Sequence, residues 1–274
     1  MLWYNILMNI FESIILGFTQ GITEFIPVSS SGHLEIVERI IGNRSGDFHL
    51  FLEMINIGTL LALLFFYRKR ILSILQDVFQ KKDYKMAMNI LITAIPAGIL
   101  GFLLSKVIEG WSFFSSIYTI AIAMAVIGAM MIFVEKLPHK SKLKDETKLS
   151  KSRALVIGLT QVLALIPGVS RSGSTILAGR MMGLNSKSAA EYSFLASIPI
   201  MVGVCLKSVL SSSSRAYIAA NFGLLALSNT VALVVGLFAI RFLFDFLKRR
   251  NALPVFGYYR VILGSLILIF ALII

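Results

Sequence analysis

Three long stretches of this chain contain no charged residue, and they constrain its fold more than any other feature. They cover residues 86–105, 111–134 and 216–240. Each reaches the roughly 20 residues that a helix needs to cross the hydrocarbon core of a bilayer. Only 15% of the residues are charged, whereas soluble domains carry about 25%. These features predict an integral membrane protein with several spanning helices and exclude a soluble fold.

Basic residues gather between the apolar stretches, in three clusters at 68–85, 136–153 and 248–250. Loops rich in Lys and Arg stay on the cytoplasmic side of a membrane, so these clusters predict the cytoplasmic face. The net charge of +12 therefore belongs mainly to loops beside an anionic membrane surface. We expect membrane lipids as partners and no nucleic acid.

Alternation between the two faces of the membrane predicts six crossings. The expected spans are 50–67, 86–105, 113–134, 189–209, 217–243 and 252–274. The last span contains Arg260, which must face protein or extend toward the membrane surface. Two segments remain, 1–48 and 154–186, whose apolar runs are too short to cross and are broken by Pro, Gly and Ser. Since each must enter and leave on one side, we predict two re-entrant helical hairpins.

The two re-entrant segments are related to each other in sequence. GFTQGITEFIPVSSSGH (17–33) matches GLTQVLALIPGVSRSGS (158–174) at seven of seventeen positions, without gaps. Each half of the chain then holds one hairpin and three spans, which predicts two inverted repeats, 1–140 and 141–274, in one membrane domain. Such repeats place a site near the midplane, where their broken helices meet. The simpler alternative is two similar helix breaks with no common site.

The second segment offers groups that bind phosphate. Arg171 is a permanent cation whose planar donors suit phosphate oxygens. A helix that restarts after each break directs free N–H groups into the same space. We expect phosphate or pyrophosphate there; the alternative is that Arg171 only forms a buried ion pair with Glu24. The candidate phosphate-binding residues are Ser29, Ser31, Gly32, Ser170, Ser172, Gly173, Ser174 and Thr175.

The first segment supplies reactive groups that have no equivalent in the second: Glu24, Ser30 and His33. His33 is a candidate general acid, general base or phosphoryl acceptor. Ser30 is a candidate nucleophile if His33 or Glu24 takes its proton. Glu24 either holds a divalent cation or orients His33. Glu53, an acid inside a predicted span, is a further candidate and equally a partner for a loop cation.

The motifs QGITEFIPVSSSGH and PGVSRSGST resemble those of the undecaprenyl-diphosphate phosphatase family, also called bacitracin-resistance proteins. The likeness covers essentially the whole chain, including YYRVILG near its end. It implies an enzyme of the bacterial cytoplasmic membrane that hydrolyses undecaprenyl pyrophosphate to undecaprenyl phosphate and inorganic phosphate. This reaction recycles the lipid carrier of peptidoglycan synthesis and confers bacitracin resistance.

The resemblance also implies an all-α fold of six transmembrane helices plus re-entrant ones, often dimeric. It implies a pocket that opens to the outer face of the membrane and a divalent cation, Mg²⁺ or Ca²⁺, that supports activity. By position, Glu24, Ser30, His33 and Arg171 match the family's catalytic set. The sequence does not decide whether Ser30 or His33 is the nucleophile.

One position departs from the family's commonest pattern. The first motif usually begins with Glu, although Gln also occurs there, and here the residue is Gln20. An amide can bind a cation through its carbonyl oxygen but supplies no charge, which weakens a metal site built on Gln20 and Glu24. The alternative function is a polyprenyl-phosphate flippase, because inverted repeats with re-entrant loops also build transporters.

Overall fold

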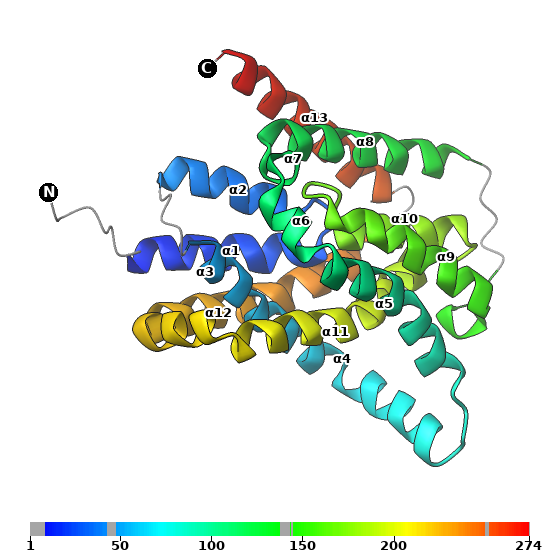
Figure 1. Cartoon of the computed structure of the whole chain (residues 1–274). Coiled ribbons are helices and arrows are strands. Elements are labelled where there is room, and N and C mark those ends of the chain that lie inside the picture. Colours follow the sequence, from blue (N-terminus) through cyan, green and yellow to red (C-terminus); the bar gives the residue numbers. More distant parts are fainter. Residues whose placement is uncertain (1–8, 43–47, 138–142, 144, 250–251, 274) are drawn as a thin grey trace, which may run out of the picture.

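The computed structural model describes residues 9–42, 48–137, 143, 145–249 and 252–273. Within these ranges the regular structure is entirely helical (Figure 1). The α-helices are α1 (Ile10–Phe25), α2 (Ser30–Ile41), α3 (Phe48–Met54), α4 (Asn56–Phe79), α5 (Lys85–Leu103), α6 (Ser105–Gly110), α7 (Ser112–Ser115), α8 (Ile117–Lys136), α9 (Lys151–Val162), α10 (Arg171–Met181), α11 (Ser186–Leu210), α12 (Ser212–Phe246) and α13 (Ala252–Ile273). Two short 3₁₀ turns cover Glu146–Lys148 and Leu163–Leu165.

Among the described residues, six helical segments are long and apolar enough to cross a membrane, which agrees with the six predicted spans, and the regular structure is all-α as predicted. Three helix pairs make the most extensive contacts: α8 packs along α13, α12 along α1, and α5 along α9. The six segments are Phe48–Phe79, Lys85–Leu103, Ile117–Lys136, Ser186–Leu210, Ser214–Phe246 and Ala252–Ile273.

The first span is longer than the sequence predicts. We expected it to end at the basic cluster that begins with Arg68, but α4 continues to Phe79. Arg70 Nη2 donates a hydrogen bond of 2.7 Å to Glu146, and Ile74 one turn later is buried. The helix therefore extends past its apolar part because its basic turn still packs against the rest of the protein.

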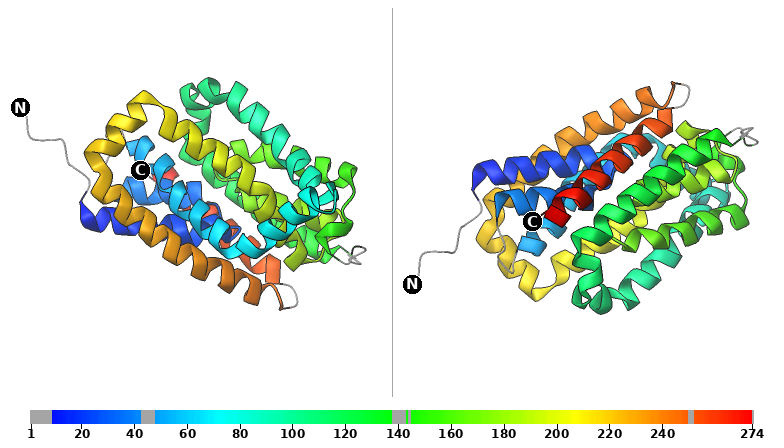
Figure 2. Two further views of the ribbon diagram at one scale, coloured as in Figure 1. Left: turned by 90° about the horizontal axis from the view of Figure 1, so that it is seen from below. Right: turned by 90° about the horizontal axis from the view of Figure 1, so that it is seen from above.

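The chain segments that carry the basic clusters lie toward one end of the bundle, and the turn between α11 and α12 lies at the other (Figures 1 and 2). Part of the second cluster, at 138–142 and 144, and Arg250 of the third fall outside the described residues. The described part of the bundle thus has one basic end and one end rich in serine.

Both predicted hairpins contain a helix break of the same construction. Ser29 and Ser170 precede α2 and α10 with positive φ angles of 77° and 71°. This left-handed conformation is rare for a residue with a side chain. In each case the serine hydroxyl accepts a hydrogen bond from a backbone N–H three residues later, on Gly32 at 3.4 Å and Gly173 at 3.1 Å. The caps stop one helix and start the next at equivalent positions.

Glycines let α1 and α4 approach α12 closely. A Cβ atom built on Gly17 would lie 2.4 Å from the carbonyl oxygen of Ser228, and one built on Gly58 would lie 2.3 Å from that of Asn229. Small residues at such crossings bring helix backbones into direct contact in membranes. These contacts hold both α1, which carries Glu24, and α4 against α12.

We expect Gly58→Ala to destabilise the protein by about 1–3 kcal/mol, because the new methyl group overpacks a backbone contact. Gly98→Ala is the matched control, since a Cβ built there meets nothing within 4 Å. The melting temperatures of both variants in the same detergent test this. If Gly58→Ala and Gly98→Ala have the same melting temperature, the close contact of α4 with α12 does not limit the stability of the protein.

Candidate active site

The two helix breaks meet in space although they are far apart in sequence. Arg171 Nη2 donates to Glu24 Oε1, which joins the second break to the first. The backbone N–H of Gly168 donates to Ser31 Oγ at 3.3 Å, and Ser172 Oγ donates to the carbonyl oxygen of Glu24 at 3.4 Å. Groups from both segments therefore surround one point.

Glu24 lies at the centre of this arrangement, with a side chain that is 10% exposed. Its Oε2 accepts hydrogen bonds from Ser30 Oγ at 2.7 Å and from Gln20 Nε2 at 3.1 Å, while Oε1 accepts from Arg171. The Oε2 atom of this carboxylate accepts directly from the Ser30 hydroxyl, so the carboxylate lies within hydrogen-bond distance of that proton. It is therefore placed to take the Ser30 proton.

The Gln20 amide is oriented by the next span. Asn56 Nδ2 donates to the carbonyl oxygens of Leu52 and Glu53 at 3.1 Å, so its Oδ1 must point the other way. That oxygen accepts from Gln20 Nε2 at 2.9 Å. The amino group of Gln20, and not its carbonyl oxygen, therefore faces Glu24.

These contacts test the expected metal site of Glu24 and Gln20. Divalent cations bind oxygen ligands, whereas here donors and the positive charge of Arg171 occupy the Glu24 carboxylate. Among the residues that the structure describes, no three His, Cys, Asp or Glu side chains gather in a way that suits a metal ion. The residues present at Glu24 and Gln20 do not fit a divalent cation held by the protein alone.

His33 lies one helical turn from Ser30 but makes its hydrogen bonds elsewhere. Its Nδ1 lies 2.7 Å from the carbonyl oxygen of Ser29, which can only accept, so Nδ1 carries a proton. Its Nε2 lies 2.6 Å from the hydroxyl of Tyr259 on α13, and the two rings stack. In this arrangement the base in contact with Ser30 is Glu24. Tyr259 was not among the predicted site residues.

Four further candidates, two from each motif, support the breaks themselves. Ser29 and Ser170 are the caps described above. Gly32 and Gly173 follow them in tight surroundings, where an added Cβ would lie 2.8 Å and 3.1 Å from neighbouring side chains. Both positions therefore favour glycine for packing.

Ser174 and Thr175 have structural contacts. Both hydroxyls donate to the carbonyl oxygen of Arg171, at 3.0 Å and 2.8 Å, and Thr175 also bonds Ser193 on α11. Both side chains are buried. Of the predicted phosphate-binding set, these two secure α10 from within instead of facing Glu24.

Arg260 connects the two breaks. It is fully buried, and its Nη1 donates to the carbonyl oxygen of Pro27 at 3.2 Å. Its Nη2 donates to those of Gly168 at 2.7 Å and Val169 at 2.9 Å, and its Nε to that of Met124 at 3.3 Å. Of the two options for this residue, facing protein is confirmed. The sequence marked Arg260 as unusual because it lies inside an apolar span, but its hydrogen-bond partners could not be predicted from the sequence.

The starts of α2 and α10 add positive potential to the site. Ser30 and Arg171 are the first residues of these helices, of 12 and 11 residues. The first N–H groups of a helix lack partners within it and attract anions. Two helix starts, a guanidinium and a hydroxyl beside a carboxylate form a site suited to phosphate chemistry.

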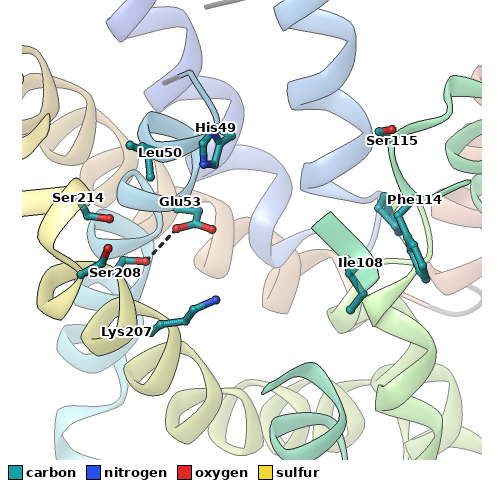
Figure 3. A pocket seen from close by; sticks show the side chains of 11 residues that line it. His49, Leu50, Glu53, Ile108, Phe114, Ser115, Lys207, Ser208 and Ser214 are labelled. Carbon is teal, nitrogen blue, oxygen red and sulfur yellow. Dashed lines mark hydrogen bonds between the residues drawn. The ribbon is translucent and has the colours of Figure 1, made fainter. Parts of the chain in front are cut away.

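A cavity of about 570 Å³ reaches the second break at Pro167, the residue before Gly168 (Figure 3). Glu53 lies in its wall, where Ser208 Oγ on α11 donates to its carboxylate at 3.2 Å. Lys207 extends from α11 toward the same open space. The cavity walls come from α3, α6, α7, α11 and the start of α12.

Comparison with known proteins agrees with this geometry. Residues 13–266 match the family model described as bacitracin resistance protein BacA. The chain is 39% identical over 267 residues to a protein of Clostridioides difficile (strain 630) named undecaprenyl-diphosphatase 1, covering 96% of each chain. It is also 39% identical over 268 residues to the undecaprenyl-diphosphatase of Persephonella marina, covering 97% of this chain and 100% of the relative. The resemblance seen in the motifs is thereby confirmed, and this chain belongs to the bacitracin resistance protein BacA family.

Proposed function

We propose that this protein hydrolyses undecaprenyl pyrophosphate to undecaprenyl phosphate and inorganic phosphate. The observation that carries the proposal is the hydroxyl of Ser30, 2.7 Å from the Glu24 carboxylate and beside Arg171. Relatives of the whole chain are named for this activity. A carrier that only moved a lipid phosphate would not need a serine hydroxyl directed at a base.

The contacts suggest the order of events. Glu24 takes the Ser30 proton while Oγ attacks the terminal phosphorus, and the bond from that phosphorus to the bridging oxygen breaks. Undecaprenyl phosphate leaves with the proton that Glu24 received, which restores the Glu24 carboxylate. A water molecule then gives a proton to Glu24 while its oxygen attacks the phosphoserine, and inorganic phosphate leaves as Ser30 Oγ regains a proton from Glu24. Arg171 and the starts of α2 and α10 stabilise charge on the transferring phosphoryl oxygens. His33 as phosphoryl acceptor is the alternative to Ser30.

We infer further that the chain forms two inverted repeats, 1–140 and 141–274, each with a re-entrant hairpin. The equivalent caps at Ser29 and Ser170 support this, as does the equivalent packing of α1 on α12 and of α9 on α5. Helices α1 and α2 have 16 and 12 residues, short of the roughly 20 that a crossing needs. A homodimer stays a prediction of the resemblance.

The same reasoning favours the cytoplasmic membrane of a bacterium, with the basic end of the bundle in the cytoplasm. The cavity of Figure 3 includes Ser211 and Ser214, which lie at the opposite end of the bundle. We therefore propose that the active site opens to the outer face of the membrane.

The deciding experiment is phosphate release from farnesyl pyrophosphate by the purified protein, with and without Mg²⁺ or Ca²⁺. We expect release by the wild type, and Ser30→Ala to lower the rate at least about 100-fold. No release by the wild type under any condition would contradict the proposed function. A trapped phosphoryl adduct on His33 instead of Ser30 would show that His33 is the nucleophile.

A further inference from the structure

The hydroxyl of Tyr259 on α13 is directed at His33, and the chemistry described above does not use it. Tyr259 Oη lies 2.6 Å from His33 Nε2. The two rings stack, with 5.7 Å between their centroids and 6° between their planes. Nδ1 of the same imidazole already donates to the carbonyl oxygen of Ser29 at 2.7 Å. Both ring nitrogens are therefore engaged, one by α13 and the other by the first helix break.

Helix α13 is closely packed where it carries Tyr259. It runs along α8 (Figure 2), and Cβ atoms built on Gly257 and Gly264 would each lie 2.6 Å from a backbone carbonyl oxygen of that helix. These two contacts lie on either side of Tyr259 in the sequence. Arg260, the next residue, donates to the carbonyl oxygens of both breaks. The packing of α13 therefore sets the position of the Tyr259 hydroxyl relative to the first break.

The contacts of His33 determine which of its nitrogens carries the proton. A neutral imidazole has one N–H, and the carbonyl oxygen of Ser29 can only accept, so this N–H is at Nδ1. Nε2 is then an acceptor, and the Tyr259 hydroxyl is its donor. A second proton on the ring is disfavoured, because the positive charge of Arg260 acts on it. The Tyr259 hydrogen bond thus keeps the single proton on the side that faces Ser29.

The carbonyl group that His33 holds belongs to the residue before Ser30. Ser29 has a φ angle of 77°, a left-handed conformation that persists only where the surroundings enforce it. Its carbonyl oxygen accepts twice from His33, from the ring and from the backbone N–H at 3.2 Å. This carbonyl is part of the peptide group that joins Ser29 to Ser30. Fixing it therefore also fixes the direction in which the Ser30 hydroxyl points toward Glu24.

We propose that Tyr259 is a positioning residue for the phosphatase reaction, and that its hydroxyl acts through His33 and the Ser29 carbonyl group to hold Ser30 at Glu24. The effect on rate rests on the proposed function. The proposal also gives His33 a part other than phosphoryl acceptor, because the lone pair on its Nε2 already accepts the Tyr259 proton.

Tyr259→Phe keeps the stacked ring and removes only the hydroxyl. We expect it to lower kcat on farnesyl pyrophosphate about 2–10-fold, the factor that one hydrogen bond supplies, while KM and the melting temperature stay near wild-type values. Tyr258→Phe is the matched control, because the neighbouring tyrosine is exposed on the same helix, and it should match the wild type in all three. A wild-type kcat in Tyr259→Phe, with or without a lower melting temperature, would overturn the proposal.

A second measurement reads the contact without turnover. Diethyl pyrocarbonate acylates the unprotonated nitrogen of a neutral imidazole, and in His33 that nitrogen accepts from Tyr259. We expect Tyr259→Phe to raise the rate of modification at His33 about 2–10-fold, measured by mass spectrometry of the full chain in detergent. Modification of His49, which lies on α3, should keep its rate and serves as the internal reference.

An unchanged rate at His33 in Tyr259→Phe would overturn the proposal, since the hydroxyl would not engage Nε2. Failure of the proposed function gives a different result. If the His33 rate rises as expected but the wild type releases no phosphate from farnesyl pyrophosphate, the function fails and the contact of Tyr259 with His33 stands.

Discussion

Glu24→Gln is expected to lower the rate of phosphate release on the order of 10³-fold, within the usual range for loss of a general base. The single oxygen of glutamine can still accept from Arg171 at the position of Oε1, and its amino group at the position of Oε2 can donate to Ser30 Oγ, so the size and planar shape of the side chain are kept. It cannot take the Ser30 proton, because an amide is not basic. The measurement is kcat on farnesyl pyrophosphate at saturating substrate.

The control for this variant is Glu35→Gln, which removes a carboxylate from α2 that pairs only with Arg39 on the same helix in the described contacts. We expect it to keep the wild-type rate. Binding of methylenediphosphonate to Glu24→Gln should also persist, which would show that the site is formed. A wild-type kcat in Glu24→Gln would contradict the assignment of Glu24 as base.

Arg260→Met is expected to have the largest effect on stability. The substitution leaves the carbonyl oxygens of Pro27, Gly168 and Val169 without the donor that they now share, and each buried unsatisfied group costs about 1–3 kcal/mol. Both breaks lose their fixed separation, so phosphate release should fall together with the melting temperature. Arg260→Lys should recover little, since one ammonium group cannot replace a planar fork of donors.

Arg241→Met is the matched control, because Arg241 also interrupts an apolar span but is exposed on α12. Its melting temperature in detergent should stay near that of the wild type. If the two methionine variants melt together, the guanidinium of Arg260 does not hold the breaks, and the contribution of that side chain is limited to packing.

Local properties of the chain were sufficient to predict an all-α fold with six candidate spanning helices. Apolar stretches of membrane length and the basic clusters between them predicted six spans, and the constant offset between two broken segments predicted that Glu24 lies near Arg171. The ion pair considered as an alternative for Arg171 is present, but it shares the Glu24 carboxylate with Ser30 and lies between two helix starts. The ion pair is therefore shown, and phosphate binding by Arg171 stays a prediction.

The residues that complete the site come from helices with no motif of their own. Asn56, Tyr259 and Arg260 reach the two breaks only because α4 and α13 pack beside them. The motif also does not show which way its side chains point. Ser174 and Thr175 have hydroxyl groups that could bind phosphate, but both donate to a carbonyl oxygen of their own helix. Such distinctions depend on helix rotation, which a single sequence does not specify.

The position of Arg260 on α13 has a consequence for biosynthesis. The ribosome releases the segment with Glu24 first, the segment with Arg171 next and α13 after both. Until α13 is in place, the carbonyl groups of the two breaks lack the donor that pairs them, and unpaired backbone groups are costly within a membrane. Maturation of the catalytic centre thus waits for the last described helix, so a nascent chain stalled before Arg260 is inserted but inactive.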